Sequence, residues 1–340
     1  MGGSSRREAR QQPGSDAAAA RLAPPAIASS TLLVAALLFV SGACALTYQL
    51  TWLRLLRLVF GHSTAASAAV LGIFMGGLGL GAIVLGRRAD RHRNPLRLYA
   101  LLEIGIAATA AATPFLIHAT RDLYTGIGGS AQLGVPAATA LRLLLSIVVL
   151  GVPTFLMGGT LSAAARAVEV GGEGRWRTAA LYGCNTLGAV TGVLLANFVL
   201  LESLGTRSTL LAAAAANAVL AAAAWLASQR VSGRTGAVTE SASPPDDLAV
   251  RRLVLATAVV AGAAFLLMEL VWYRMLAPLL GGSTYTFGVI LAVALLGIGI
   301  GGLAYALEPS SRRKVTIGRL SLVTALEALC AIVPLALGDR

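Results

Sequence analysis

A forty-residue stretch of this chain occurs twice. Residues 42–81 align without a gap with residues 262–301, at a constant offset of 220, and fourteen of the forty positions are identical. Alanine and leucine would match often by chance, but the shared patterns Trp-x-Arg, Gly-x-Ser-Thr and Gly-x-Gly-x-Gly would not. The repeat therefore indicates a duplicated helical unit, which is typical of transporter-like membrane folds.

The composition of the chain is that of a membrane protein. Of its 340 residues, 56% are hydrophobic and 12% are charged, and the mean hydropathy is +0.77. The net charge is +12, but the basic residues cluster between apolar runs instead of being interleaved with aromatic residues, as nucleic-acid binding would require. The three cysteines are scattered. We therefore expect no nucleic-acid partner, metal site, disulfide framework or cofactor.

Nine apolar runs are long enough to span a bilayer, which takes about 20 residues. They predict an all-α polytopic membrane protein with about nine transmembrane helices. The runs lie near residues 31–53, 64–86, 96–118, 139–162, 179–201, 207–228, 252–274, 284–306 and 317–338.

The distribution of arginine predicts the orientation of these helices. Most basic residues fall in the amino-terminal segment and in alternate loops, and because such residues are retained in the cytoplasm, we expect a cytoplasmic amino terminus. Residues 1–30 cannot bury a core and predict a disordered cytoplasmic arm. The chain then divides into a six-helix membrane half (31–228), a cytoplasmic linker (229–250) and a second membrane half (251–340).

Six helices precede the second copy, so both copies are expected to enter the membrane in the same direction. Two halves related by an axis along the membrane normal form the parallel repeat of major-facilitator transporters. A matching second half would have six helices, whereas residues 251–340 supply three. Either the fold tolerates a short second half, or this half is truncated in a piece of a longer protein, which is the favoured interpretation.

Five stretches, covering most of residues 40–305, carry a family resemblance. They are GACALTYQLTWLRLLRLVFGHST, GGLGLGAIVLGRRADRHRNPLRLYALLEIGIA, PTFLMGGTLSAAARA, LYGCNTLGAVTGVLLANFVLLESLGTRSTL and GAAFLLMELVWYRMLAPLLGGSTYTFGVILAVALLGIGIGG. The chain resembles the membrane module of bacterial fused proteins in which a major-facilitator-like part precedes a spermidine-synthase-like domain. The resemblance implies a bacterial inner-membrane protein linked to polyamine synthesis or transport.

The aminopropyltransferase chemistry of that soluble domain has no counterpart in this chain. It requires a Rossmann-like sheet with a glycine-rich turn and substrate-binding aspartates. The glycine clusters at 76–81 and 297–302 instead lie inside apolar runs. Any such activity would therefore belong to a separate fused or associated domain, and we assign no catalytic residue.

Acidic residues inside apolar runs are candidates for function, because a charge at the bilayer centre costs about 2.5–3.5 kcal/mol on insertion scales. Glu103 and Glu269 meet this description, and Glu269 occupies the repeat position of Gln49. Two interpretations stay open for the acids: they line a cavity that binds a cationic solute or a proton, or they pair with an arginine on another helix. Asn185 is a further cavity candidate, although interhelical hydrogen bonds are the favoured role of Asn185, Asn197 and Asn217.

The segment from Gly86 to Arg91 has the Gly-x-x-x-Asp-Arg spacing of the major-facilitator loop between helices two and three. Gly86, Asp90 and Arg91 are therefore candidates for a conformational latch, in which the aspartate pairs with an arginine or a helix N-terminus. The alternative, which is favoured, is a positively charged membrane anchor with one compensating acid.

Other repeated residues predict structural roles. We expect the tryptophans and arginines of the two copies at the outer membrane interface; they are Trp52, Arg54, Trp272 and Arg274. The glycines at four-residue and two-residue spacing predict close helix packing; they are Gly77, Gly79, Gly81, Gly297, Gly299 and Gly301. Replacing Gly79 or Gly299 by leucine is expected to weaken folding.

Two classes of function follow. One is a module that binds or transports a polyamine or a related small cation across the lipid bilayer. The other is a membrane scaffold that anchors an enzyme domain and moves nothing itself. A stand-alone transporter of the major-facilitator type is a third possibility.

Overall fold

A computed structural model describes residues 25–60, 64–168, 174–231, 248–308 and 316–338. Within these ranges the chain is helical and contains no strand. The elements are α2 (Pro25–Phe60), α3 (Thr64–Arg91), α4 (Pro95–Gly126), α5 (Gly129–Val168), α6 (Gly174–Leu195), the π-helix η1 (Ala196–Leu200), α7 (Leu201–Ser203), α8 (Gly205–Val231), α9 (Leu248–Leu280), α10 (Thr284–Leu307) and α11 (Ile317–Gly338).

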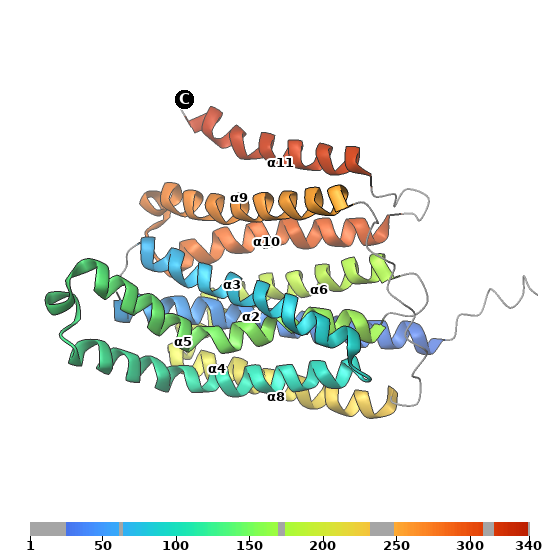
Figure 1. The fold of residues 1–340 in the computed structure, drawn as a ribbon, viewed down its shortest axis with the longest axis horizontal. Helices are drawn as coiled ribbons and strands as arrows, with labels where there is room; N and C mark the ends of the chain where they lie inside the picture. The colour runs from blue at the N-terminus through green and yellow to red at the C-terminus, as the bar shows by residue number, and fades with distance from the viewer. Residues whose placement is uncertain (1–24, 61–63, 169–173, 232–247, 309–315, 339–340) are drawn as a thin grey trace, which may run out of the picture.

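The long helices lie side by side along a common direction (Figure 1). Eight of them, from α2 to α10, are long and apolar enough to cross a membrane. Helix α11 occupies the ninth predicted run. The prediction of an all-helical, multi-pass membrane protein is thus confirmed for the described residues. Most of the predicted arm and of the predicted linker lies outside those residues, while α2 already begins at Pro25, inside the segment expected to be disordered.

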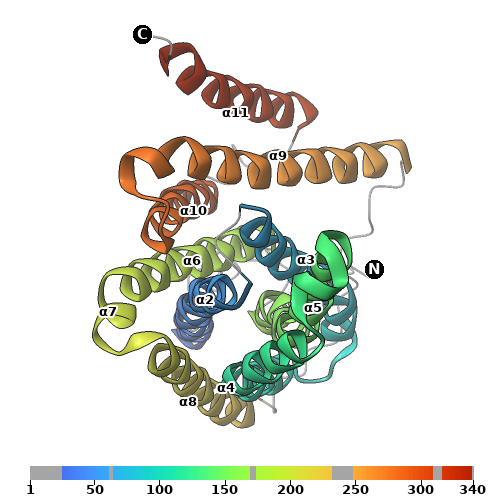
Figure 2. The same cartoon turned by 90° about the vertical axis from the view of Figure 1, so that its left-hand side faces the viewer.

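Helix α2 is the centre of the first six-helix half. Figure 2 shows it enclosed by α3, α4, α5, α6 and α8, and it packs mainly against α6 and α8. Its side chains Leu38, Tyr48, Leu50 and Trp52 are fully buried. Because no other helix of this half is surrounded on all sides, polar groups on α2 have the least access to lipid.

Glycine permits the closest contact of α2, which is with α6. A Cβ atom added at Gly188 would overlap the carbonyl group of Phe39, and one added at Gly192 would overlap that of Ala43. Helices α3 and α5 approach each other in the same way, at Gly81 and Gly158. Without an aqueous hydrophobic effect between helices in lipid, such backbone contacts supply much of the packing energy.

The second copy is attached to this half mainly through α10, which packs along α6. Helix α9 packs against α10 and α3, and its buried side chains are Glu269 and Tyr273. Its amino-terminal part is largely exposed, as at Val259 and Val260. Figure 1 places α11 beyond α9, at the edge of the molecule.

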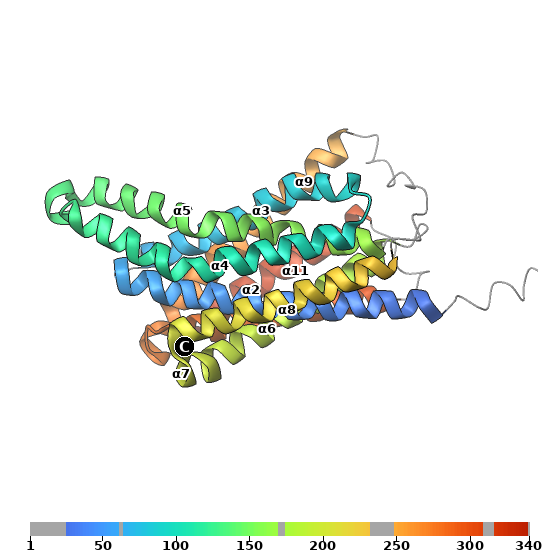
Figure 3. The same cartoon turned by 90° about the horizontal axis from the view of Figure 1, so that it is seen from below.

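Helices α4 and α5 extend well beyond the predicted runs 96–118 and 139–162. They form a long hairpin that projects past the other helices (Figure 3), and α5 contains a break at Gly134, where φ is 72°. Arg142 Nε donates a hydrogen bond of 3.0 Å to the hydroxyl of Tyr124 across the hairpin. The difference arises because an apolar run marks the extent of a membrane span, whereas a helix continues until its backbone is interrupted.

Candidate functional site

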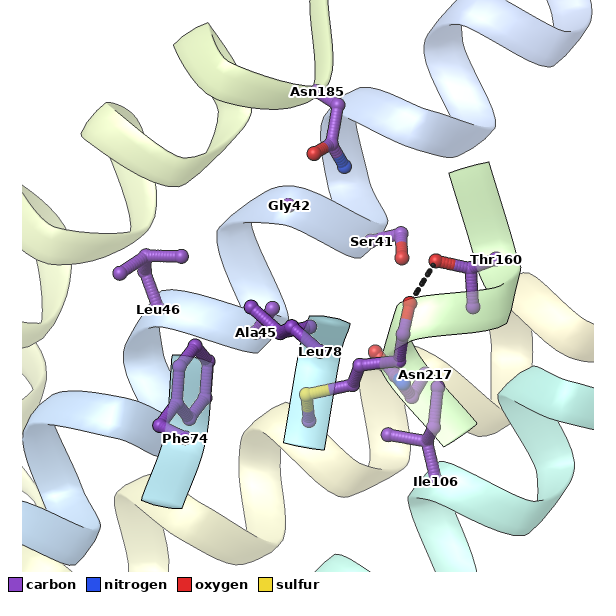
Figure 4. Close-up of a pocket in the computed structure, with 11 residues that line it drawn as sticks. Ser41, Gly42, Ala45, Leu46, Phe74, Leu78, Ile106, Thr160, Asn185 and Asn217 are labelled. Carbon is purple, nitrogen blue, oxygen red and sulfur yellow. Dashed lines mark hydrogen bonds between the residues drawn. The ribbon is translucent and has the colours of Figure 1, made fainter. Parts of the chain in front are cut away.

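A cavity lies within the first six-helix half, next to α2 (Figure 4). All six long helices of this half, α2, α3, α4, α5, α6 and α8, contribute to its wall, so the cavity is a product of the tertiary fold. Its lining residues are Ser41, Gly42, Ala45, Leu46, Phe74, Leu78, Ile106, Met157, Thr160, Asn185 and Asn217.

Glu103 lies directly behind this wall. Its carboxylate is fully buried and accepts two hydrogen bonds, from Ser41 Oγ to Oε1 at 2.6 Å and from Asn217 Nδ2 to Oε2 at 2.8 Å. Both donors line the cavity. Glu103 itself is not among the lining residues, and its carboxyl group is held one side chain away from the cavity.

Asn217 contributes an unused hydrogen-bond acceptor. While its Nδ2 is bonded to Glu103, its buried Oδ1 has no partner among the described residues. A buried carbonyl oxygen without a partner costs about 1–3 kcal/mol. Asn217 belongs to the cavity wall, so this oxygen lies close to the cavity although the atom itself is buried.

The other polar lining groups are already engaged. Thr160 Oγ1 donates to the carbonyl oxygen of Met157 at 2.8 Å, the interaction drawn in Figure 4. Asn185 Nδ2 donates to the carbonyl oxygen of Leu38 at 3.0 Å. Such bonds to the backbone fix the orientation of both side chains. The remaining wall is apolar, so the cavity combines a few polar groups with an apolar surface, as small-molecule sites do.

Gly42 explains how the polar groups of α2 and α6 come together. A Cβ atom at this position would overlap the backbone carbonyl group of Asn185. Any larger residue would separate the two helices and displace the amide of Asn185 from the wall. The sequence signal for this contact is the glycine that the two copies share at positions 42 and 262.

Gln49 and Glu269 are related by the repeat and are both buried, with exposures of 2% and 0%. Neither belongs to the wall of the cavity. The Oε1 atom of Gln49 and both carboxylate oxygens of Glu269 lack partners among the residues that the structure describes. The second copy thus buries a carboxyl group at the position where the first copy buries a neutral amide.

Among the residues that the structure describes, neither acid pairs with an arginine. Within the described ranges, the hydrogen bonds to Glu103 come from Ser41 and Asn217, and Glu269 has none. By contrast, all three asparagines form the expected interhelical bonds, since Asn197 Nδ2 donates to the carbonyl oxygen of Tyr285 at 3.0 Å.

Arg57 is a buried contact between the copies that the sequence did not reveal. Its guanidinium group lies 5.3 Å from the ring centroid of Tyr273 and donates to the tyrosine hydroxyl at 3.0 Å. That hydroxyl in turn donates to the carbonyl oxygen of Gly282 at 2.9 Å. The repeat places Ala277 at the position equivalent to Arg57 and Leu53 at the position equivalent to Tyr273. The repeat therefore cannot form the same contact a second time. A charged residue in an apolar run, absent from the other copy, was the available signal.

The expectation of an aromatic belt fails for Trp52. This side chain is fully buried, its Nε1 donates to Thr113 Oγ1 at 2.9 Å, and its ring stacks on Tyr48. Trp272 and Arg54 are half-buried and Arg274 is exposed. Helix α2 is central whereas α9 is peripheral, so equivalent positions meet core in one copy and the surface in the other.

The latch candidates lie at the end of α3. Gly86 faces Ser162 of α5, while Asp90 and Arg91 are exposed. Among the described residues Asp90 forms no ion pair. The structure therefore places Asp90 and Arg91 on the surface, and within the described ranges it brings no ion-pair partner to the aspartate.

The repeated glycines divide into two groups. Cβ atoms at Gly77 and Gly81 would overlap α5, and one at Gly299 would come within 2.9 Å of Leu187 on α6. The other three would meet nothing within 4 Å in the described structure, which corrects the packing role expected for Gly79, Gly297 and Gly301.

Protein-family models, curated proteins and solved structures were each compared with the chain, and none of the three comparisons gives a match.

Proposed function

We propose that this membrane protein binds and transports a small organic cation through the cavity beside Glu103. The observation that carries the proposal is the arrangement of Glu103, Ser41 and Asn217, in which a fully buried carboxylate is fixed behind a cavity whose wall holds an unpartnered carbonyl oxygen. We propose that a bound ligand reaches this buried oxygen and donates a hydrogen bond to it, in the field of the Glu103 carboxylate.

An ammonium group suits this chemistry better than an anion or a neutral sugar. It carries hydrogen-bond donors and no acceptors, and its charge compensates the carboxylate, which in an apolar surrounding is costly without a counter-charge. The apolar remainder of the wall, including Phe74, Leu78 and Ile106, suits a methylene chain. Putrescine and spermidine combine both features, which agrees with the polyamine link that the family resemblance implies.

Glu269 supports transport in preference to a passive scaffold. A carboxyl group without a partner inside an apolar helix contact weakens the fold, and intramembrane acids of this kind often carry a proton or a coupling ion. A scaffold that only anchors an enzyme domain has no use for such a group, and no use for a polar cavity.

The two glycine groups support a parallel repeat of the major-facilitator type. Helices α3 and α10 are equivalent, yet α3 packs on α5 through Gly77 and Gly81, and α10 packs on α6 through Gly299, which corresponds to Gly79. Each helix thus carries glycines on two faces, and in the described structure only one of these faces packs closely against a neighbouring helix. In a complete repeat, counterparts of α5 and α6 would cover the face that each leaves bare. A spermidine-synthase-like domain, fused or associated, would then act on the cytoplasmic side.

The test is uptake of labelled putrescine and spermidine into proteoliposomes. Glu103→Gln keeps the size of the side chain and removes the charge, and we expect it to abolish saturable uptake. Glu202→Gln is the matched control, because Glu202 is an exposed acid at the end of the bundle. Glu269→Gln is expected to retain binding and to lose accumulation against a gradient.

Equal uptake by the wild type and Glu103→Gln would contradict the proposed site. The absence of saturable binding and uptake in the wild type, for both amines, would favour the scaffold.

A further inference from the structure

A second hollow lies where α4 begins and α8 ends. The two helices pack along each other, and Figure 3 shows both of these ends on the same side of the bundle. Its wall consists of Asn94, Arg97, Trp225, Ser228 and Gln229. None of these residues belongs to the cavity beside Glu103.

Arg97 is held in place by an aromatic ring. Its guanidinium carbon lies 4.5 Å from the centroid of the Trp225 ring. Stacking uses the face of the guanidinium group and leaves the N–H donors at its edge for an oxyanion, for which their fork geometry is well suited. Arg97 is itself exposed, so these donors are accessible.

The wall around Arg97 is fixed by hydrogen bonds between the two helices. Asn94 Oδ1 accepts from the backbone N–H of Arg97 at 3.1 Å, and Asn94 Nδ2 donates to the carbonyl oxygen of Ser228 at 3.2 Å. Ser228 Oγ donates to the carbonyl oxygen of Trp225 at 2.7 Å. The hollow is therefore a formed feature of the α4–α8 contact.

The charge around the hollow is strongly positive. Six exposed arginines lie at the adjoining ends of α3, α4 and α8, against one acid, Asp90, which gives a net charge of +5. The arginines are Arg87, Arg88, Arg91, Arg93, Arg97 and Arg230. Such a field attracts an anion to this end of the bundle.

Two apolar stripes lead away from the hollow along the membrane-spanning parts of the helices. On α4, Leu101 and Ile104 follow Arg97 at helical spacing of four and seven residues, and each is 47% exposed. On α8, Leu226 and Val219 precede Gln229 by three and ten residues and are 60% and 70% exposed. An oxyanion site above two exposed apolar stripes has the form of a headgroup site above acyl chains.

We propose that this hollow binds one anionic phospholipid, with the phosphate on the Arg97 edge and the acyl chains along the α4 and α8 stripes. A free phosphate would bind to Arg97 but would make no contact with the exposed apolar stripes of α4 and α8. The site is separate from the proposed transport cavity, so either proposal can fail alone.

Native mass spectrometry of the whole chain, released from detergent micelles, tests the site. Phosphatidylglycerol is the probe, phosphatidylcholine is the neutral comparison, and glycerol 3-phosphate represents the headgroup without chains. We expect the wild type to retain one phosphatidylglycerol with about tenfold preference over phosphatidylcholine, the size expected for one charge-assisted contact. Arg97→Gln should abolish this preference.

Arg93→Gln is the matched control, because it removes an equal charge from the same end but not from the wall of the hollow. We expect it to keep most of the preference, and thermal unfolding without added lipid should show both variants folded. An equal loss in the two variants would indicate diffuse surface charge and overturn the site. Displacement of the lipid by glycerol 3-phosphate, or equal retention of the two lipids by the wild type, would also overturn it.

Discussion

The neighbouring glycines Gly79 and Gly81 provide a sharp test of how α3 packs, because the same substitution should act in opposite directions at the two positions. A Cβ atom at Gly81 would overlap the backbone carbonyl group of Phe155 on α5 and lie 3.1 Å from the Cα of Gly158. A Cβ atom at Gly79 would meet nothing within 4 Å in the described structure.

The magnitudes follow from these surroundings. Gly81→Ala forces two backbones apart, and overpacking of this kind costs about 1–3 kcal/mol. The better helix propensity of alanine offsets up to about 1 kcal/mol of that cost. Gly79→Ala has only the favourable effect, because the residue is exposed. Because the propensity gain is common to both variants, we expect their free energies of unfolding to differ by the overpacking cost alone, about 1–3 kcal/mol, with Gly81→Ala the less stable.

Equilibrium unfolding in mixed micelles, followed by tryptophan fluorescence, measures this difference. Trp52 is fully buried and packs against Phe74 of α3, so its emission reports on the core next to the altered helix. The reasoning is refuted if Gly81→Ala proves as stable as Gly79→Ala, since α3 and α5 would then not be in backbone contact at this point. The leucine substitution at Gly79 is likewise expected to be tolerated in this chain, contrary to what its place in the repeat suggested.

Three further predictions concern buried polar groups. Tyr273→Phe removes the hydroxyl that joins Arg57 to the second copy and should destabilise the protein by about 1–3 kcal/mol in the same unfolding assay, whereas Tyr285→Phe at an exposed ring should be neutral. Ser41→Ala leaves a buried carboxylate oxygen of Glu103 without its donor and should cost a similar 1–3 kcal/mol, a loss that removing the carboxylate in a double variant should partly reverse. Glu269→Leu should maintain or raise stability while abolishing transport; a marked loss of stability would show that the carboxyl group has a structural partner.

The Glu269→Leu variant is expected to separate the effect on stability from the effect on transport. At functional sites, replacing a buried polar group often raises the stability of the fold and lowers its activity. A purely structural glutamate would reduce both quantities together.

The sequence alone determined that the chain is helical, where its helices lie and which asparagines join them. A bilayer leaves a spanning segment no way to satisfy its backbone except a helix, so apolar length is sufficient to locate one. Within that rule the nine runs coincide with long helices from α2 to α11, and a buried amide such as that of Asn197 must find a partner on a neighbour.

Only the tertiary structure decided which face of each helix is buried and by what. Trp52 and Trp272 are equivalent in sequence, yet one is in the core and the other is half-buried, because α2 is surrounded and α9 is peripheral. Glu103 gained its partners from α2 and α8, at sequence separations of 62 and 114 residues. The hydropathy of the sequence indicates which part of a helix lies in the membrane. The rotation of that helix and the identity of its neighbours depend on packing between segments that are distant in the chain.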